Sequence, residues 1–116
     1  MIHFKYTILY VDDVNTTLIF YEKAFGFKRK FISPDNEYGE LETGETTLSF
    51  ASKTLAASNL KKGFIESDLS NKPFAIEIGF ATDNVEATVN TAVSAGATIL
   101  EHPKTTSWGQ VVAYVR

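Results

Sequence analysis

Residues 4–26 read FKYTILYVDDVNTTLIFYEKAFG, and residues 74–96 read FAIEIGFATDNVEATVNTAVSAG. Each stretch begins with a run of β-branched and aromatic residues, which favours a largely buried strand. A polar break follows, Asp12-Asp13 in the first stretch and Thr82-Asp83-Asn84 in the second, and then come apolar residues at helical spacing and a glycine. Because the same features recur in the same order, the sequence indicates an internal duplication, and this decides the architecture.

The first stretch predicts a strand over 4–11 and a helix that is capped by Asn15 or Thr16 and ends at Gly26. The residues after it predict three more strands, with turns at Ser33-Pro34-Asp35-Asn36 and Thr43-Gly44-Glu45. These strands are expected over 27–33, 38–42 and 46–52.

The second stretch predicts a strand over 74–81 and a helix over 85–95 that ends at Gly96. Two further strands are expected, over 97–101 and 110–115. The chain is therefore expected to be a single α+β domain over 1–116, built from two tandem βαβββ modules whose curled mixed sheet surrounds a cleft. The last strand of the second module is absent from the chain.

The segment between the modules differs in composition from both. Module one is expected over about 1–52, the linker over about 53–72, and module two over about 73–116. The linker is rich in Ser, Lys, Asn and Ala, with a short helical turn expected over 54–59. Since it is long for a connection, it is either a plain linker or a loop that covers something.

The composition excludes several classes of function. The chain has 116 residues, a net charge of −3 and no cysteine, which rules out zinc-thiolate sites and cysteine nucleophiles. Its basic residues are scattered, so no nucleic-acid partner is expected. No apolar run approaches the roughly 20 residues of a membrane span, and residues 1–5 lack the apolar core of a signal peptide. We expect a cytoplasmic protein with no membrane partner.

Motifs from both halves resemble those of the vicinal-oxygen-chelate superfamily, which includes glyoxalase I, extradiol dioxygenases and bleomycin-resistance proteins. In the first half these are Tyr10-Val11-Asp12-Asp13-Val14 and the run Phe20-Tyr21-Glu22-Lys23-Ala24-Phe25-Gly26-Phe27. In the second they are 80–85, 95–97 and 108–116. The resemblance implies paired βαβββ modules around a common cleft, and a homodimer in which the cleft or its rim is shared.

The resemblance also implies where a metal would be held. Metal-dependent members place one ligand on each of the first, fourth, fifth and eighth strands, and the first three positions correspond to Tyr6, Ser49 and Glu77. Tyrosine and serine are poor ligands for Ni, Zn or Fe compared with histidine and carboxylate. His3 is expected on the opposite face from Tyr6, and His102 in a loop. We therefore expect no metal and no cofactor.

Glu77 is expected inside an apolar strand, where an unpaired carboxylate would cost several kcal/mol. In the structural interpretation it is hydrogen-bonded to Tyr6 or Ser49 and holds the modules together. In the functional interpretation it is a general base, or a hook for a cationic or amide group, with a pKa raised by apolar walls. The two interpretations remain open.

Aromatic residues are the second indication of a binding site, because ligand pockets are mainly apolar with a few orienting polar groups. Trp108 lies in a loop-to-strand step, where it either contacts a ligand or packs as a lid on the dimer seam. The residues expected to bind the ligand are Tyr6, Tyr38, Ser49, Phe50, Phe64, Glu77, Trp108 and Gln110.

Three hypotheses follow. The first is a metal-independent binding protein of the glyoxalase/bleomycin-resistance type, whose small-molecule ligand is aromatic or cationic. The second is a lyase or isomerase, with or without a divalent metal, in which Glu77 abstracts a proton next to a carbonyl and Tyr6 hydrogen-bonds the enolate. The third is a structural dimer with a vestigial cleft.

Overall fold

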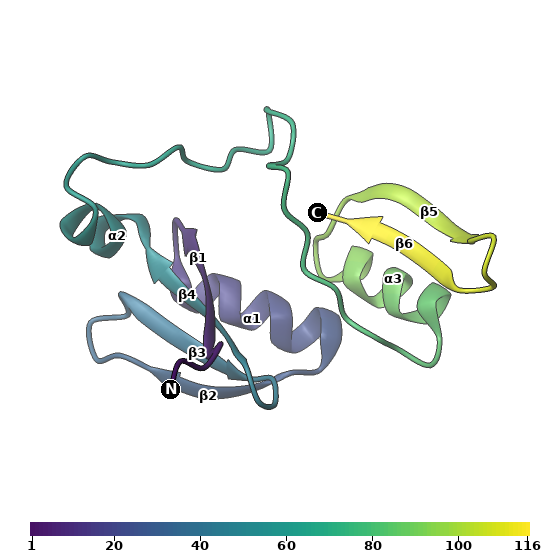
Figure 1. The fold of residues 1–116 in the computed structure, drawn as a ribbon, viewed down its shortest axis with the longest axis horizontal. Helices are drawn as coiled ribbons and strands as arrows, with labels where there is room; N and C mark the ends of the chain where they lie inside the picture. The colour runs from purple at the N-terminus through teal and green to yellow at the C-terminus, as the bar shows by residue number, and fades with distance from the viewer. The chain divides into compact units, whose positions relative to one another are not determined.

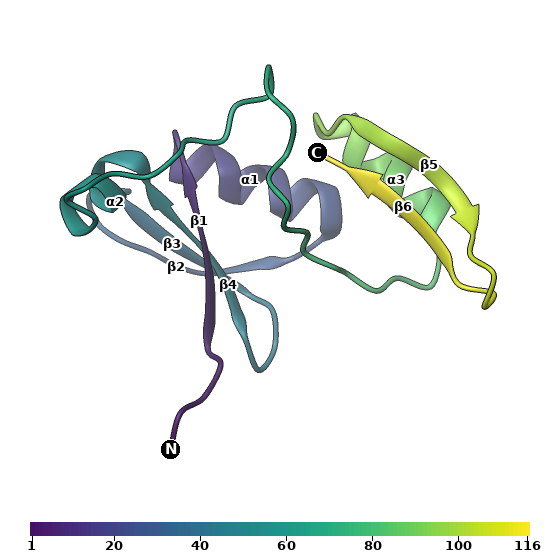
Figure 2. The ribbon, with the colours of Figure 1, turned by 45° about the horizontal axis from the view of Figure 1, so that its top comes forward.

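The computed structural model describes all 116 residues and has the predicted mixture of helices and strands (Figures 1 and 2). The chain divides into two compact units, the first formed by residues 1–19 and 27–78 and the second by residues 20–26 and 79–116. The α+β fold class is confirmed, with curled sheets that do not close into a barrel.

Unit one contains a four-stranded mixed sheet with strand order β1-β4-β3-β2. Strand β1 runs parallel to β4, and the other two pairs are antiparallel. The mixed sheet and the succession of one strand, one helix and three strands are those predicted for module one. The strands are β1 (Tyr6–Val11), β2 (Lys28–Ile32), β3 (Tyr38–Glu42) and β4 (Thr47–Ser52).

Helix α1 (Val14–Phe25) follows β1, but its cap differs from the prediction. Asp13 Oδ1 accepts a hydrogen bond from the Thr16 backbone N–H at 2.8 Å, so Asp13 caps the helix and not Asn15 or Thr16. The polar break itself supplies the cap. The helix ends where predicted, at Gly26, which has a φ of 72°.

One face of the unit-one sheet packs against α1. Gly39 and Leu41 of β3 are buried, while the alternate residues Tyr38 and Glu40 are only partly buried. A Cβ atom built on Gly39 would lie 2.7 Å from Leu18 Cδ1, so the Leu18 side chain occupies the space that β3 leaves by lacking a side chain here. The largest fully buried residues of this core are Phe50, Leu18, Leu41 and Val14.

Helix α2 (Lys53–Asn59) begins directly after β4 and confirms the predicted helical turn over 54–59. The Ser52 hydroxyl accepts a hydrogen bond from the Leu55 backbone N–H at 3.0 Å and caps it. Residues 60–84 then form no helix and no strand.

Unit two contains α3 (Val85–Ser94), β5 (Ile99–Thr105) and β6 (Val111–Val115). Asn84 caps α3, since its side-chain oxygen accepts a hydrogen bond from the Ala87 backbone N–H at 3.0 Å. Strands β5 and β6 form an antiparallel hairpin. The core of this unit is built from small residues, with larger apolar side chains around them. It comprises Ala24, Ala92 and Ala97, with Phe20, Phe25, Ala95 and Val115 packed against them.

Two sequence predictions are wrong in the second half. Residues 74–81 form no strand, although their apolar alternation favours one. In unit one the corresponding strand, β1, is held by β4, and the 116 residues contain no counterpart of β4 after β6. Without such a partner, the backbone groups of 74–81 have no ladder to join. His102, expected in a loop, lies within β5.

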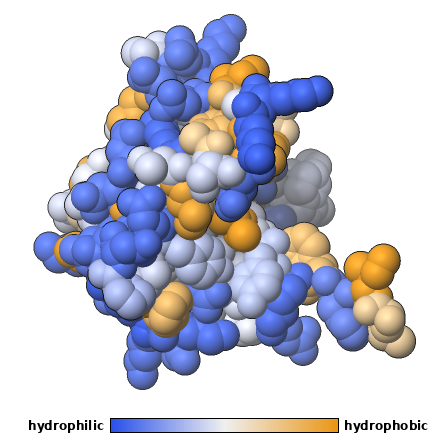
Figure 3. Space-filling view, turned by 90° about the vertical axis from the view of Figure 1, so that its left-hand side faces the viewer, coloured by the Kyte–Doolittle hydropathy of each residue, from blue (hydrophilic) through white to orange (hydrophobic).

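The surface shown in Figure 3 is mostly hydrophilic, with hydrophobic side chains in separate small groups. None of the three helices combines the length and hydropathy needed to cross a membrane.

Candidate functional site

The face of the unit-one sheet that points away from α1 carries Tyr6, Tyr38 and Ser49, three of the residues predicted for the site. We call it the open face. Because residues in register on neighbouring strands share a face, Tyr6, Ile8 and Tyr10 of β1 lie beside Thr47, Ser49 and Ala51 of β4. On the next strand, Tyr38 and Glu40 complete the face. Figure 1 shows the sheet with α1 on its other side.

Tyr38, Glu40 and Ser49 form the polar centre of the open face. The Tyr38 hydroxyl donates a hydrogen bond of 2.7 Å to Glu40 Oε2, and Glu40 is in register with Ser49, which is fully buried. Burial raises the pKa of the Tyr38 hydroxyl to about 12, and the hydrogen bond and charge of Glu40 act in the same direction. A hydrogen bond with Ser49 lowers this pKa in part. Tyr38 is therefore a neutral donor at physiological pH, and Glu40 is its acceptor.

Aromatic rings flank this polar centre. Tyr6 is 47% exposed on β1, and Phe31 of β2 lies with its ring centroid 6.5 Å from that of Tyr38. At the end of β1, the Tyr10 ring meets the Phe64 ring edge-on at a centroid distance of 4.9 Å. The open face thus combines one carboxylate with several rings whose faces or edges can contact a guest.

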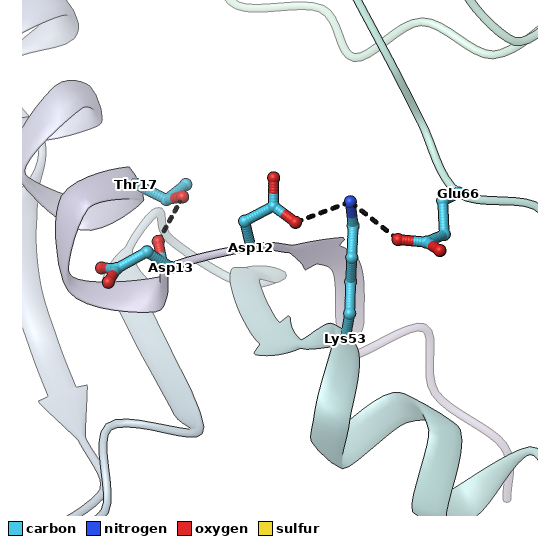
Figure 4. A network of polar contacts seen from close by, with 5 residues as sticks. All are labelled: Asp12, Asp13, Thr17, Lys53 and Glu66. Atoms are coloured by element: carbon cyan, nitrogen blue, oxygen red, sulfur yellow. Dashed lines mark hydrogen bonds and ion pairs between the residues drawn. The ribbon is translucent and has the colours of Figure 1, made fainter.

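A network of charged residues lies at the same end of β1. Lys53 Nζ lies 2.8 Å from Asp12 Oδ1 and 3.0 Å from Glu66 Oε1, so one ammonium bridges two carboxylates (Figure 4). Hydrogen bonds to Asp12 and Glu66 raise the pKa of Lys53. The neighbouring Asp13 is used in capping α1, and its backbone carbonyl also accepts a hydrogen bond from the Thr17 hydroxyl.

The structure places four of the predicted ligand-binding residues in unit one near the open face: Tyr6, Tyr38, Ser49 and, through its contact with Tyr10, Phe64. Phe50 does not join them. It is fully buried and alternates with Ser49 along β4, so it points into the core beneath α1. The expectation that Phe50 lines the cleft is wrong, because the two-residue period of a strand gives Ser49 and Phe50 opposite faces.

Trp108 and Gln110 lie in unit two, in the turn between β5 and β6. Trp108 is 75% exposed, and its Nε1 donates a hydrogen bond of 3.1 Å to Gln110 Oε1. The turn places Gly109 between them at a φ of 90°. These two side chains are partners of one another within their own hairpin.

Glu77 is not surrounded by apolar walls, contrary to expectation. It lies in the segment 74–81, which forms no strand, and its side chain is exposed to solvent. It forms no hydrogen bond with Tyr6 or Ser49. The structure therefore supplies neither the burial of the general-base interpretation nor the partner of the structural interpretation.

The residues at the family's metal positions do not fit a divalent metal. Tyr6 and Ser49 share the open face, but Glu77 belongs to no strand of the sheet. No group of three or more His, Cys, Asp or Glu side chains lies close enough together to hold a metal ion. Since Ni, Zn and Fe sites are built from such donors, we derive no step through a metal.

Two hollows are lined by residues that do not belong to the polar centre of the open face. The first, of about 310 Å³, is in unit two. It is lined by Glu86, Val89, Asn90, Ile99, His102 and Pro103. The second, of about 300 Å³, lies at the β3–β4 turn around Thr43 and Gly44. Neither hollow combines a hydrogen-bonded polar pair with neighbouring aromatic rings, as the open face does. We therefore take the open face as the candidate site.

Sequence reasoning missed Glu40, Tyr10 and Phe31. Glu40 was within reach, because it lies two residues after Tyr38 on a predicted strand and must share its face. Tyr10 likewise follows Tyr6 by four residues in β1. Phe31 could not be assigned to this face from the sequence, because the bulge between Arg29 and Phe31 shifts the register of β2 against β3.

Comparison with solved structures finds several similar folds. A hypothetical protein from S. aureus, SA1046, has a TM-score of 0.80 and 23% identity, covering 100% of this chain and 86% of its own. A glyoxalase-related enzyme from Fulvimarina pelagi has a TM-score of 0.82 and 16% identity, covering 99% and 80%. Lactoylglutathione lyase from Agrobacterium tumefaciens has a TM-score of 0.63 and 19% identity, covering 98% and 84%. At these identities the likeness shows the fold alone.

No curated protein matches the sequence. A family model does, and the match extends over residues 3–116, almost the whole chain. It includes both stretches, 4–26 and 74–96, from which the duplication was inferred. The chain belongs to the Glyoxalase/Bleomycin resistance protein/Dioxygenase superfamily.

Proposed function

We propose that this protein is a metal-independent small-molecule binding protein of the glyoxalase/bleomycin-resistance type, and that its ligand is a small aromatic cation. The observation that carries the proposal is the Tyr38–Glu40 pair, hydrogen-bonded at 2.7 Å on a partly exposed strand face. A carboxylate between aromatic rings suits an organic cation, because the carboxylate supplies the opposite charge and the ring faces attract positive charge.

The rest of the open face supports the same ligand class. The Tyr38 hydroxyl remains protonated up to high pH, so it adds no negative charge of its own and directs its proton to Glu40. Tyr6 and Ile8 are 47% and 44% exposed and offer apolar contact area beside the polar centre. Binding sites for small molecules commonly combine such area with a few orienting polar groups.

The donor set argues for binding without a metal. Neither Tyr6 nor Ser49 is a good ligand for Ni, Zn or Fe, and the exposed Glu77 is not part of any group of three or more His, Cys, Asp or Glu side chains that could hold a metal. No observation supports the alternative in which Glu77 abstracts a proton, so we do not carry it forward.

The proposal also includes that the protein is cytoplasmic and that it works as a homodimer. Sedimentation equilibrium of the purified chain tests whether it is a homodimer.

Thermal unfolding with matched probes tests the proposal. Benzyltrimethylammonium should raise the Tm of the wild-type chain, whereas benzenesulfonate, which has the same ring and the opposite charge, should not. A ligand at ten times its Kd stabilises the folded state by about 1.4 kcal/mol. In the Glu40→Gln variant the effect of the cation should shrink, while Glu101→Gln, a charge change in β5 of the other unit, should leave it intact.

Equal shifts with both probes, or an undiminished shift in Glu40→Gln, would show that Glu40 does not select a cation. Elemental analysis of protein purified without chelators provides the second test. Stoichiometric Ni, Zn or Fe would contradict the metal-independent part of the proposal.

A further inference from the structure

Lys53 joins three parts of unit one that are distant in the sequence. It is the first residue of α2, and its ammonium contacts Asp12 at the end of β1 and Glu66 in the connection after α2. Figure 4 shows Lys53 standing between the two carboxylates, which approach from opposite sides. The Lys53 side chain is only 22% exposed, although both partners are largely in solvent.

A second contact fixes the same short segment. Phe64 lies two residues before Glu66 and meets the Tyr10 ring edge-on at 4.9 Å. Tyr10 belongs to the open face, since it is in register with Ala51 and two residues beyond Ile8. The ion pair and the ring contact therefore hold the segment 60–66 at one end of the open face.

The backbone of this segment is bonded to α2 at its start, where the Leu60 N–H donates to the Ala56 carbonyl, and to itself through the Gly63 N–H and the Leu60 carbonyl; neither bond reaches β1. Residues 60–66 belong to no helix or strand, and their ordering costs conformational entropy. An exposed ion pair changes an equilibrium constant by a factor of about five at most. Here one ammonium forms two ion pairs, and an aromatic contact lies close by. These contacts act together, because each one lowers the conformational entropy that the segment still has to lose when the next one forms.

We propose that Lys53 is a positioning residue that holds the segment 60–66 in place, so that Phe64 forms a wall at the Tyr10 end of the open face. The positioning does not depend on any ligand. The role of Phe64 as a wall of the binding site rests on the proposed function.

Limited proteolysis with trypsin measures the positioning directly. The bonds after Lys61 and Lys62 lie in the segment, and cleavage after Lys62 requires Phe64 to enter the protease two residues beyond the cut. The Phe64 ring must therefore leave Tyr10 before the chain can be cut. The rate of cleavage after Lys62 then reports the population of molecules in which the segment is released. Cleavage after Lys5, outside the segment, is the internal reference, and each product is quantified by mass spectrometry.

The Lys53→Met variant keeps most of the aliphatic stem and loses both ion pairs. Relative to wild type, its cleavage after Lys61 and Lys62 should accelerate at least about threefold. Glu66→Gln should accelerate it less, and the double variant should resemble Lys53→Met alone, because both changes act on one bridge. The control Lys104→Met changes an exposed lysine in β5 and should match wild type. Circular dichroism confirms that each variant is folded.

Salt supplies an independent measurement. Raising the ionic strength from 0.05 to about 0.5 M should accelerate cleavage of wild type relative to the Lys5 reference, and should have little effect in Lys53→Met. Cleavage in Lys53→Met within twofold of wild type, or an identical salt response in both, would overturn the positioning role.

Binding of benzyltrimethylammonium then tests the wall. Phe64→Ala and Lys53→Met should both raise its Kd, while Lys104→Met should not. Faster proteolysis with unchanged Kd would confirm the positioning and reject Phe64 as part of the binding site. If wild type itself does not bind the probe, the proposed function fails, and the proteolysis result still decides the role of Lys53.

Discussion

Gly39 provides the sharpest test of how unit one is packed. It lies in β3 between Tyr38 and Glu40, two of the three residues of the polar centre, and faces α1. A Cβ atom at this position would lie 2.7 Å from Leu18 Cδ1 and 3.0 Å from Val14 Cγ1. Ordinary van der Waals contacts of a Cβ lie at 3.4–4 Å. The substitution Gly39→Ala therefore requires the buried Leu18 side chain, or the helix that carries it, to shift.

The expected cost follows from two opposing effects. Leu18 and Val14 are 0% and 2% exposed, so neither can swing away, and overpacking of this kind costs about 1–3 kcal/mol. Replacing glycine by alanine also restricts the unfolded chain, which returns about 0.4–1 kcal/mol. The free energy of unfolding should fall by roughly 1.3 kcal/mol, the difference between the middles of these two ranges.

Urea denaturation followed by circular dichroism measures this change through the midpoint and the m-value. Gly79→Ala is the matched control, because a Cβ there meets nothing within 4 Å, and it should leave stability unchanged or slightly raised. In a Leu18→Ala background the penalty of Gly39→Ala should shrink, since the clashing methyl is gone. A Gly39→Ala protein as stable as wild type would refute the close approach of α1 to β3.

Three further outcomes follow from the structure. Because the pKa of Tyr38 is raised to about 12 in the folded chain, the unfolded chain loses this proton at a lower pH. Tyr38→Phe should therefore lessen the decline in stability between about pH 10 and 12, and ultraviolet titration at 295 nm should lose a step near pH 12. Asn84→Ala removes the cap of α3 and should cost about 1 kcal/mol in thermal or urea unfolding, and a change below 0.3 kcal/mol would argue against the cap. Phe50→Ala should lower the free energy of unfolding by about 3–5 kcal/mol, because Phe50 is fully buried. If Phe50 instead lined an open ligand site, its replacement by alanine would lower the free energy of unfolding far less.

The positions of helix ends and turns could be predicted from the sequence. The ends of α1 and α3 at Gly26 and Gly96 are confirmed, and both glycines have positive φ. The turn after β2 is confirmed as well, with the Asn36 N–H donating to the Ser33 carbonyl at 2.9 Å. These features depend on neighbouring residues only, so a single sequence contains the information needed to place them.

Features that depend on distant partners could not be predicted in this way. The alternation in 74–81 indicates a chain suited to a strand, but a strand forms only when another strand supplies its hydrogen bonds. Glu77 was a candidate base because the resemblance places it at the family's chemical position and because an apolar strand was expected to bury it, and its exposure removes the second of these premises. The contact of Phe64 with Tyr10 likewise joins residues more than 50 positions apart, and no local pattern predicts it.

The candidate site was predictable in part. The period of two in a strand assigns Tyr38 and Glu40 to one face, and it also separates Ser49 from Phe50. Applied strictly, it would have replaced Phe50 by Glu40 in the predicted site. What it cannot supply is which face of the sheet α1 covers, and this decides which set of residues is open.

The most direct test of the central claim is an NMR titration of ¹⁵N-labelled protein with benzyltrimethylammonium, with benzenesulfonate as the matched anion. We predict saturable shifts of the backbone amides of Tyr6, Tyr38, Glu40 and Ser49 with the cation, weak or absent shifts with the anion, and loss of the cation response in Glu40→Gln. Saturable shifts confined to unit two, or equal responses to cation and anion on the open face, would contradict the account.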